Sequence, residues 1–205
     1  MNGSIIKIFE EKLENIAKLN QKRELIDSYR TTDSIIIRKK KKLISFCCND
    51  YLGLSQNKDV IKASISATKK YGVGAGASRL VSGNNELYKK LENSIAKYKG
   101  EEAACVFGSG FLTNLGIIPV ITSSKDLIIY DELSHASTNL GIKLSSAKII
   151  KYRHNDIKEI DLILKNNRNK YKNCFLLTEG VFSMDGDRFC IFFVQRAYNI
   201  IVKIY

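Results

Sequence analysis

The stretch that decides the fold is CVFGSGFLTN, residues 105–114. The apolar run at 103–107 predicts a buried strand, and the Gly-Ser-Gly after it lets the backbone turn sharply. Apolar side chains from Phe111 to Ile118 then recur at helical spacing. A strand, a glycine turn and a helix start together point free N–H groups at an anion. In isolation an ordinary turn is the simpler interpretation, but the downstream segments favour an anion site.

Predicted strands and helices alternate around this stretch. Helices are expected at 5–29, 57–71, 86–98 and 134–144, and strands at 43–47, 127–130, 147–152 and 174–178. Asp156 is expected to cap a further helix, and Glu159 three residues later resembles a capping box. The alternation predicts an α/β fold with a largely parallel sheet.

Composition narrows the function classes. The 205 residues are 44% hydrophobic and carry a formal net charge of +12. The lysines are scattered through amphipathic segments, and the one dense basic run, at 38–42, is interpreted as a solvated turn, so no nucleic-acid partner is expected. No apolar run is long enough to cross a membrane, and no signal peptide is recognised. The five cysteines form no C-x-x-C pair and are expected to be small buried hydrophobes in a reducing compartment, the cytoplasm.

Three other kinds of site fit the sequence poorly. The glycines at 72–77 match a dinucleotide fingerprint in letters, but a predicted helix precedes them where a strand is needed. Ser109 lacks the G-x-S-x-G spacing of a hydrolase nucleophile. His135 and His154 have no partner at metal-ligand spacing, so no metal site is expected.

Six motifs in a fixed order carry a resemblance to a known family. They are NDYLGL at 49–54, SRLVSG at 78–83, SGF with Asn114 at 109–114, D-x-x-SHAS at 131–137, RHND at 153–156 and TEGVFSMDGD at 178–187. As a set they resemble the α-oxoamine synthases. These pyridoxal-phosphate-dependent enzymes condense an amino acid with an acyl-CoA and release carbon dioxide. The resemblance implies the type I aminotransferase fold and a homodimer. The alanine-using branch is favoured, while glycine-acetyltransferase-like and 5-aminolevulinate-synthase-like members stay open.

The resemblance also implies roles for individual cofactor-site residues. Gly110 and Phe111 match backbone donors to the cofactor phosphate, and His135 matches the imidazole that stacks on the pyridine ring. Ser183 matches a hydroxyl that contacts the ring oxygen. Glu179 matches an acid near the cofactor, with a helix or turn cap as the alternative role.

Two further residues are matched to the substrates. Asn49 matches a contact to the substrate carboxylate, with a turn-forming Asn as the alternative. Arg23 is matched loosely to an arginine that faces the acyl substrate, with a surface arginine as the alternative.

The family's Schiff-base lysine follows the Met-Asp-Gly-Asp motif, and no lysine here lies in that context. No catalytic residue is therefore assigned, and the chain is expected to be inactive alone. The expected organisation is a helical arm and short strand at 1–48, a partial cofactor-binding domain at 49–187 and a divergent apolar tail at 188–205. A frameshift or early stop would produce such a tail, and it is expected to lie as a strand against the edge of the sheet. A genuine short member of the family, and a non-catalytic remnant or partner subunit, stay open as alternatives.

Overall fold

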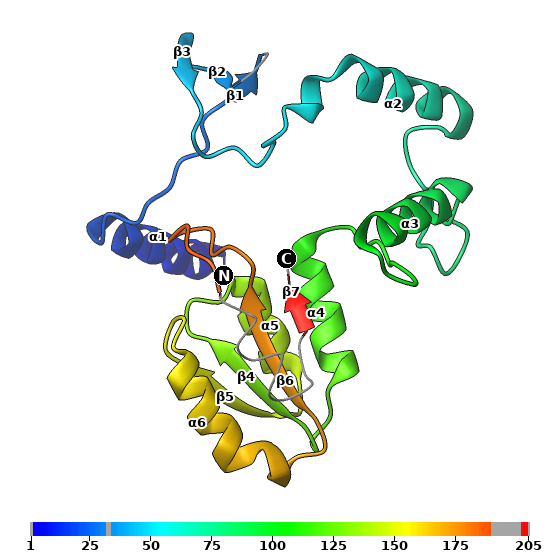
Figure 1. Ribbon diagram of the computed structural model, residues 1–205. Helices are drawn as coiled ribbons and strands as arrows, with labels where there is room; N and C mark the ends of the chain where they lie inside the picture. The colour runs from blue at the N-terminus through cyan, green and yellow to red at the C-terminus, as the bar shows by residue number, and fades with distance from the viewer. Residues whose placement is uncertain (1, 32–33, 190–201, 205) are drawn as a thin grey trace. The chain divides into compact units, whose positions relative to one another are not determined.

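The computed structural model describes residues 2–31, 34–189 and 202–204 (Figure 1). The chain divides into two compact units, Met1–Asn85 and Glu86–Tyr205. The boundaries predicted at 48 and 187 stay a prediction.

The first unit combines helices with a small antiparallel sheet. Its elements are α1 (Asn2–Lys18), β1 (Ser28–Arg30), β2 (Ile35–Arg38), β3 (Lys41–Ile44), the 3-10 turn η1 (Leu54–Gln56) and α2 (Lys58–Tyr71). The sheet order is β1-β2-β3. Lys39 and Lys40 form the hairpin turn with φ angles of 47° and 61°, so the dense basic run is the exposed turn that was expected.

The first helix is shorter than the prediction of 5–29. α1 ends at Lys18, and Asn20 takes a left-handed φ of 54°. The N–H groups of Asn20 and Gln21 donate to the carbonyls of Ala17 and Ile16, which closes the helix end. The apolar spacing did not reveal this stop, because a left-handed Asn ends a helix without interrupting the pattern.

The second unit is the predicted parallel α/β layer. It contains α3 (Glu86–Lys99), α4 (Gly110–Ile121), β4 (Leu127–Asp131), α5 (Ala136–Leu144), β5 (Lys148–Tyr152), α6 (Ile157–Asn167), the 3-10 turn η2 (Arg168–Lys170), β6 (Cys174–Glu179) and β7 (Val202–Ile204). The sheet order is β5-β4-β6-β7, and all three pairings are parallel. β7 therefore supplies the tail strand that was expected beside β6. The rest of the predicted tail strand, 190–201 and 205, lies outside the described residues.

The sheet is packed on both faces (Figure 1). Leu127 and Ile129 of β4 pack with Ile160 and Leu164 of α6. Ile128 lies between them in sequence and faces the opposite side of the sheet. It packs there in a second cluster with Ile118 of α4, Ile142 of α5, Ala147 and Leu177. The alternation along one strand thus places α6 on one face and α4 with α5 on the other.

The strand predicted at 103–107 is wrong. These residues form no strand, and the N–H of Val106 donates to Oε1 of Glu92 on α3 at 3.0 Å. An apolar run becomes a strand only when a neighbouring strand takes its backbone groups. Here a helix side chain takes one of them.

Among the four described cysteines, the prediction of burial is correct for one and wrong for two, and Cys190 lies outside the described residues. Cys174 is buried in β6, but Cys47 and Cys105 are exposed and Cys48 is half-buried. Cys47 lies beyond the end of β3, and Cys105 lies in the segment that forms no strand. Neither position is covered by a packed layer.

The predicted cap of α6 forms in part. Oδ1 of Asp156 accepts the N–H of Glu159 at 2.9 Å, as expected. Glu159, however, accepts the backbone N–H and Nε of Arg153 at 2.9 and 3.1 Å, and the N–H of Asp156 donates to the Arg153 carbonyl. The capping box is therefore replaced by a cap that also holds the loop after β5.

Candidate cofactor site at the carboxyl end of the sheet

The start of α4 presents backbone donors that no described residue accepts. Oγ of Ser109 caps the helix by accepting the N–H of Leu112 at 3.2 Å, and the Ser109 carbonyl accepts the N–H of Thr113 at 3.0 Å. The N–H groups of Gly110 and Phe111 form no hydrogen bond among the described residues. Gly110 begins the helix, as the sequence predicted, and a β-carbon there would meet nothing within 4 Å. This helix start can therefore accept an anion.

His135 lies beside α4 through a chain of side-chain hydrogen bonds. Nδ2 of Asn114, one turn into α4, donates to Oγ of Ser137 at 2.9 Å, and that Oγ lies 2.7 Å from Nδ1 of His135. Nδ1 also accepts the backbone N–H of Ser137 at 3.2 Å. An Nδ1 that accepts leaves the proton of the neutral ring on Nε2. The ring is exposed, so one face and its Nε2–H are open to a ligand.

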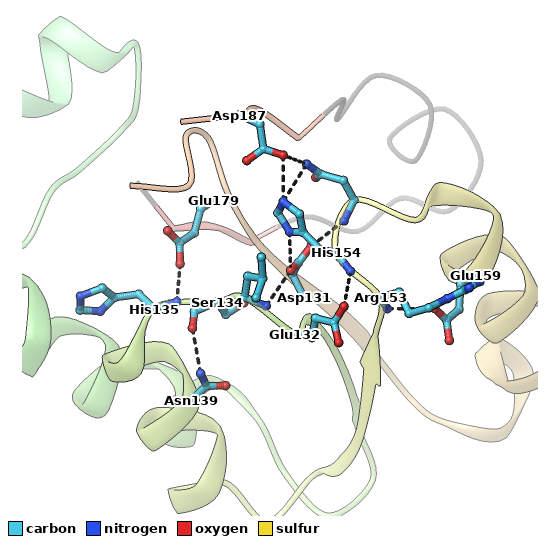
Figure 2. Close-up of polar contacts among 12 residues, drawn as sticks. Asp131, Glu132, Ser134, His135, Asn139, Arg153, His154, Glu159, Glu179 and Asp187 are labelled. Carbon is cyan, nitrogen blue, oxygen red and sulfur yellow. Dashed lines mark hydrogen bonds and ion pairs between the residues drawn. The ribbon is translucent and has the colours of Figure 1, made fainter. Parts of the chain in front are cut away.

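Glu179 joins the same edge of the sheet from β6. Its Oε1 accepts the backbone N–H of His135 (Figure 2). The carboxylate thus caps the approach to α5, which is the alternative role that the sequence left open. The hydrogen bonds of Asn114 and Ser137 link His135 to α4, the helix that Gly110 and Phe111 begin, and Glu179 contacts the backbone of His135 directly.

Ser183 lies in a tight turn just after β6. The N–H of Phe182 donates to the carbonyl of Asp187 at 3.0 Å, and the N–H of Gly186 donates to the carbonyl of Phe182 at 2.7 Å. Gly186 has a φ of 77°, a conformation that favours glycine. Phe182 is buried, whereas Ser183 is exposed at the outside of the turn.

The two predicted substrate residues belong to the first unit. Arg23 and Asn49 are both exposed. The neighbours of Asn49 are ordered by an ion pair: Arg30 on β1 lies 3.0 Å from Asp50, and Asp50 also accepts Oγ of Ser55 at 2.6 Å. The Ser55 hydroxyl is the main reason that the pKa of Asp50 is lowered. Asn49 is thus exposed on an ordered turn.

Sequence reasoning missed a second polar cluster at this edge. The His154 ring lies between two carboxylates, with Nδ1 at 2.9 Å from Oδ1 of Asp131 and Nε2 at 2.8 Å from Oδ2 of Asp187 (Figure 2). Asp131 is fully buried and also accepts the N–H groups of Leu133 and Asn155, each at 2.9 Å. Each residue follows or ends a parallel strand, and the carboxyl ends of such strands meet at one edge. The position of these residues at or after the ends of predicted strands was the sequence signal that could have revealed the cluster.

The cluster shifts the protonation of His154. Burial acts against the charged ring, but the hydrogen bonds and negative charges of Asp131 and Asp187 outweigh it and raise the pKa of His154 above its ordinary value. The site therefore contains one imidazole that accepts at Nδ1, His135, and one held between two acids, His154.

Two negative findings concern the described residues alone. None of their helices is long and apolar enough to cross a membrane. Among the same residues, no group of three or more His, Cys, Asp or Glu side chains is arranged to hold a metal ion.

A parallel sheet with helices on both faces, an anion-accepting helix start and an exposed imidazole agree with a type I aminotransferase fold. Residues 41–193 match the family model for aminotransferase class I and II. The chain belongs to this family, in its α-oxoamine synthase branch.

Two curated relatives are similar to this chain. The chain is 49% identical over 177 residues to a protein named putative 8-amino-7-oxononanoate synthase from Parvibaculum lavamentivorans, covering 86% of this chain and 46% of that protein. It is 53% identical over 153 residues to 8-amino-7-oxononanoate synthase from Methylocella silvestris, covering 75% of this chain and 44% of the relative. The chain spans less than half the length of these two relatives.

Solved structures agree with the fold. The serine palmitoyltransferase of Sphingomonas wittichii has a TM-score of 0.84 at 27% identity, covering 96% of this chain and 50% of that one. A structure described as SPT with PLP has a TM-score of 0.87 at 25% identity, with 97% and 52% covered. The 8-amino-7-oxononanoate synthase of Francisella tularensis has a TM-score of 0.64 at 30% identity, with 77% and 43% covered.

Proposed function

We propose that this chain carries the pyridoxal-phosphate-binding part of an acyltransferase of the 8-amino-7-oxononanoate synthase type. Such an enzyme condenses alanine with an acyl-CoA, with decarboxylation, in biotin synthesis. One observation carries the proposal: an anion-accepting helix start, at Gly110 and Phe111, is joined through Asn114 and Ser137 to the exposed ring of His135. The names of the relatives support the particular reaction. The proposal includes a homodimer in the cytoplasm.

The residues present fit the cofactor in their chemistry. A phosphate group suits the free N–H groups of Gly110 and Phe111, and the open space at Gly110 lets it approach the backbone. The flat face of His135 suits an aromatic ring. The exposed hydroxyl of Ser183 suits a ring oxygen. Pyridoxal phosphate supplies, when bound, an electron sink that makes the α-proton of an amino acid removable.

The protein's part is to fix these groups before the ligand arrives. The hydrogen bond from Ser137 keeps Nδ1 of His135 an acceptor, so the ring cannot rotate freely about its χ2 angle. Glu179 holds the backbone N–H of the same residue. A ring held at both its backbone and its side chain offers a fixed face, which lowers the entropy cost of binding. Asn49 and Arg23 are proposed to contact the amino-acid carboxylate and the acyl substrate.

Equilibrium binding of pyridoxal phosphate tests the proposal. The chain is titrated with the cofactor, followed by its absorbance, with inorganic phosphate as competitor. His135→Ala removes the ring, and the matched variant His135→Phe keeps a flat aromatic face. We expect saturable binding that phosphate weakens, with affinity reduced about tenfold by the Ala variant and less by the Phe variant. Binding that is not saturable, or equal affinity in all three proteins, would contradict the proposal.

The choice of amino acid is tested on the loaded protein. Alanine and glycine are added separately at equal concentration, and the absorbance change is compared with that of free cofactor. The alanine-using branch predicts the larger site-specific change with alanine. A larger change with glycine would instead favour the 5-aminolevulinate-synthase-like or glycine-acetyltransferase-like branches.

A further inference from the structure

The contacts of His154 determine its proton count. Both ring nitrogens lie within hydrogen-bond distance of a carboxylate oxygen, at 2.9 Å from Asp131 and 2.8 Å from Asp187. Ionised carboxylates only accept, and a neutral imidazole carries one N–H. Two such contacts therefore need one more proton than a neutral ring and two ionised acids supply. Each oxygen of the fully buried Asp131 carboxylate already accepts a backbone N–H group, so the geometry assigns the extra proton to the ring.

The same ring holds the turn that carries Ser183. The His154 ring and the buried ring of Phe182 pack perpendicular to each other, with centroids 4.5 Å apart and planes at 89°. Asp187 is bound by Nε2 of His154 and by Nδ2 of Asn155. Phe182 and Asp187 are the first and last residues of the turn, and the backbone bond between them closes it. His154 thus contacts both ends of a turn in which Ser183 is one of the exposed residues.

We propose that the doubly protonated ring of His154 positions the turn at 182–187, and with it Ser183, by tying Asp187 to the buried Asp131. His154 is a positioning residue and contacts neither cofactor nor substrate. The role of Ser183 rests on the proposed function, whereas the link from His154 to the turn does not. Loss of the second ring proton places a lone pair against a carboxylate, and one of the two contacts opens.

Charged and titratable groups surround this ring on several elements. Three acids face the ring or its backbone: Asp131 of β4, Asp187 in the turn, and Glu132 after β4, whose Oε1 accepts the His154 N–H at 3.0 Å. Arg153, next in the chain, is paired with Asp156 and Glu159 of the α6 cap. The hydrogen bonds and charges of Asp131 and Asp187 favour the imidazolium form of His154.

Nuclear magnetic resonance on the full chain, without cofactor, tests this link. The chain has two histidines, so the His154→Gln variant assigns the ring signals. We expect His154 to keep protons on both nitrogens to a higher pH than an ordinary imidazole does and to lose one as the pH rises further. Amide protection of Phe182 and Gly186, corrected for intrinsic exchange, is expected to fall at least about tenfold over that same titration, while β4 amides stay protected.

Variants separate a positioning role from general destabilisation. His154→Gln is expected to give low turn protection at every pH, with no titration step. Asp185→Asn removes an exposed acid of the same turn and is expected to keep both the titration and the protection. A neutral His154 beside a protected turn, or turn protection that ignores the ring titration, would overturn the proposal. If His154→Gln does not fold, the pH titration of the wild type still distinguishes these outcomes. Both the ring titration and the amide protection are measured without cofactor, so a failure of cofactor binding affects neither measurement.

Discussion

Gly141 of α5 lies so close to α4 that a β-carbon on it would stand 2.5 Å from the carbonyl oxygen of Asn114. The side chain of the same Asn114 donates to Ser137 and, through it, orders His135. The close contact between α4 and α5 therefore fixes the position of Asn114 relative to Ser137, and so the position of His135 relative to α4.

Gly141→Ala is expected to destabilise the chain by about 1–3 kcal/mol, because backbone must move to admit the methyl group. In an unconstrained helix the same change would stabilise by up to about 1 kcal/mol. Gly116→Ala on α4 is the matched control: its β-carbon would meet only the end of the Phe107 ring, at 3.2 Å. Urea unfolding measures both, and equal stability of the two variants would contradict the close approach.

Asp131→Ala is expected to cost about 3 kcal/mol of unfolding free energy. It leaves two backbone N–H groups and one ring nitrogen without their buried acceptor. Asp185→Ala, an exposed acid in the same unit, is expected to change stability by less than about 0.5 kcal/mol. Urea unfolding at neutral pH compares them, and similar losses in both variants would show that Asp131 does not organise this edge.

Protonation of Asp126 is expected to account for part of the loss of unfolding free energy at acid pH. It accepts Oγ of Ser123 at 2.6 Å, which is the main cause of its lowered pKa, and the backbone and side chain of Asn173. A lowered pKa in the folded state gives stability that is present above the unfolded pKa of about 4 and lost as pH falls through the folded value. Asp126→Asn is therefore expected to unfold more easily near neutral pH, and its deficit is expected to shrink with acidification. A deficit that stays constant from about pH 6 to pH 3 would exclude this linkage.

Borohydride reduction in the presence of pyridoxal phosphate tests the lysine prediction. None of the chain's lysines lies in the family's context, so we expect scattered, substoichiometric labelling on peptide mapping. Surface labelling of an unrelated basic protein at equal concentration gives the background. One lysine labelled stoichiometrically, and protected by inorganic phosphate, would refute the prediction.

The helices and the parallel strands of the second unit could be predicted because their apolar spacing matches the packing they make. Ile128 and Ile129 face opposite sides of the sheet. Asp156 caps the start of α6, as expected for an aspartate directly before a helix. The apolar run at 103–107 misled because apolarity shows that a segment is suited to burial but does not show whether a strand partner exists. The end of α1 was missed because Asn20 closes it by conformation, without a change in pattern.

The site was predicted in its parts and missed in its connections. Gly110 was placed at a helix start because the glycine turn shows it in the sequence. The carboxylate–imidazole–carboxylate cluster joins residues 23 and 33 positions apart, and its contacts depend on strand register. Register between parallel strands depends on packing against both helical layers, which one sequence does not reveal.

Gly110→Pro tests whether α4 begins at a phosphate site made of backbone N–H groups. Proline suits the first position of a helix and removes the Gly110 donor, while Gly110→Ala keeps the donor and places its methyl group in open space. The measurement is the dissociation constant of pyridoxal phosphate for wild type and both variants, with circular dichroism as the check on folding. We expect Gly110→Pro to raise the dissociation constant about tenfold or more, and the value for Gly110→Ala to stay within about threefold of wild type. Equal affinity of folded Gly110→Pro and wild type would contradict it.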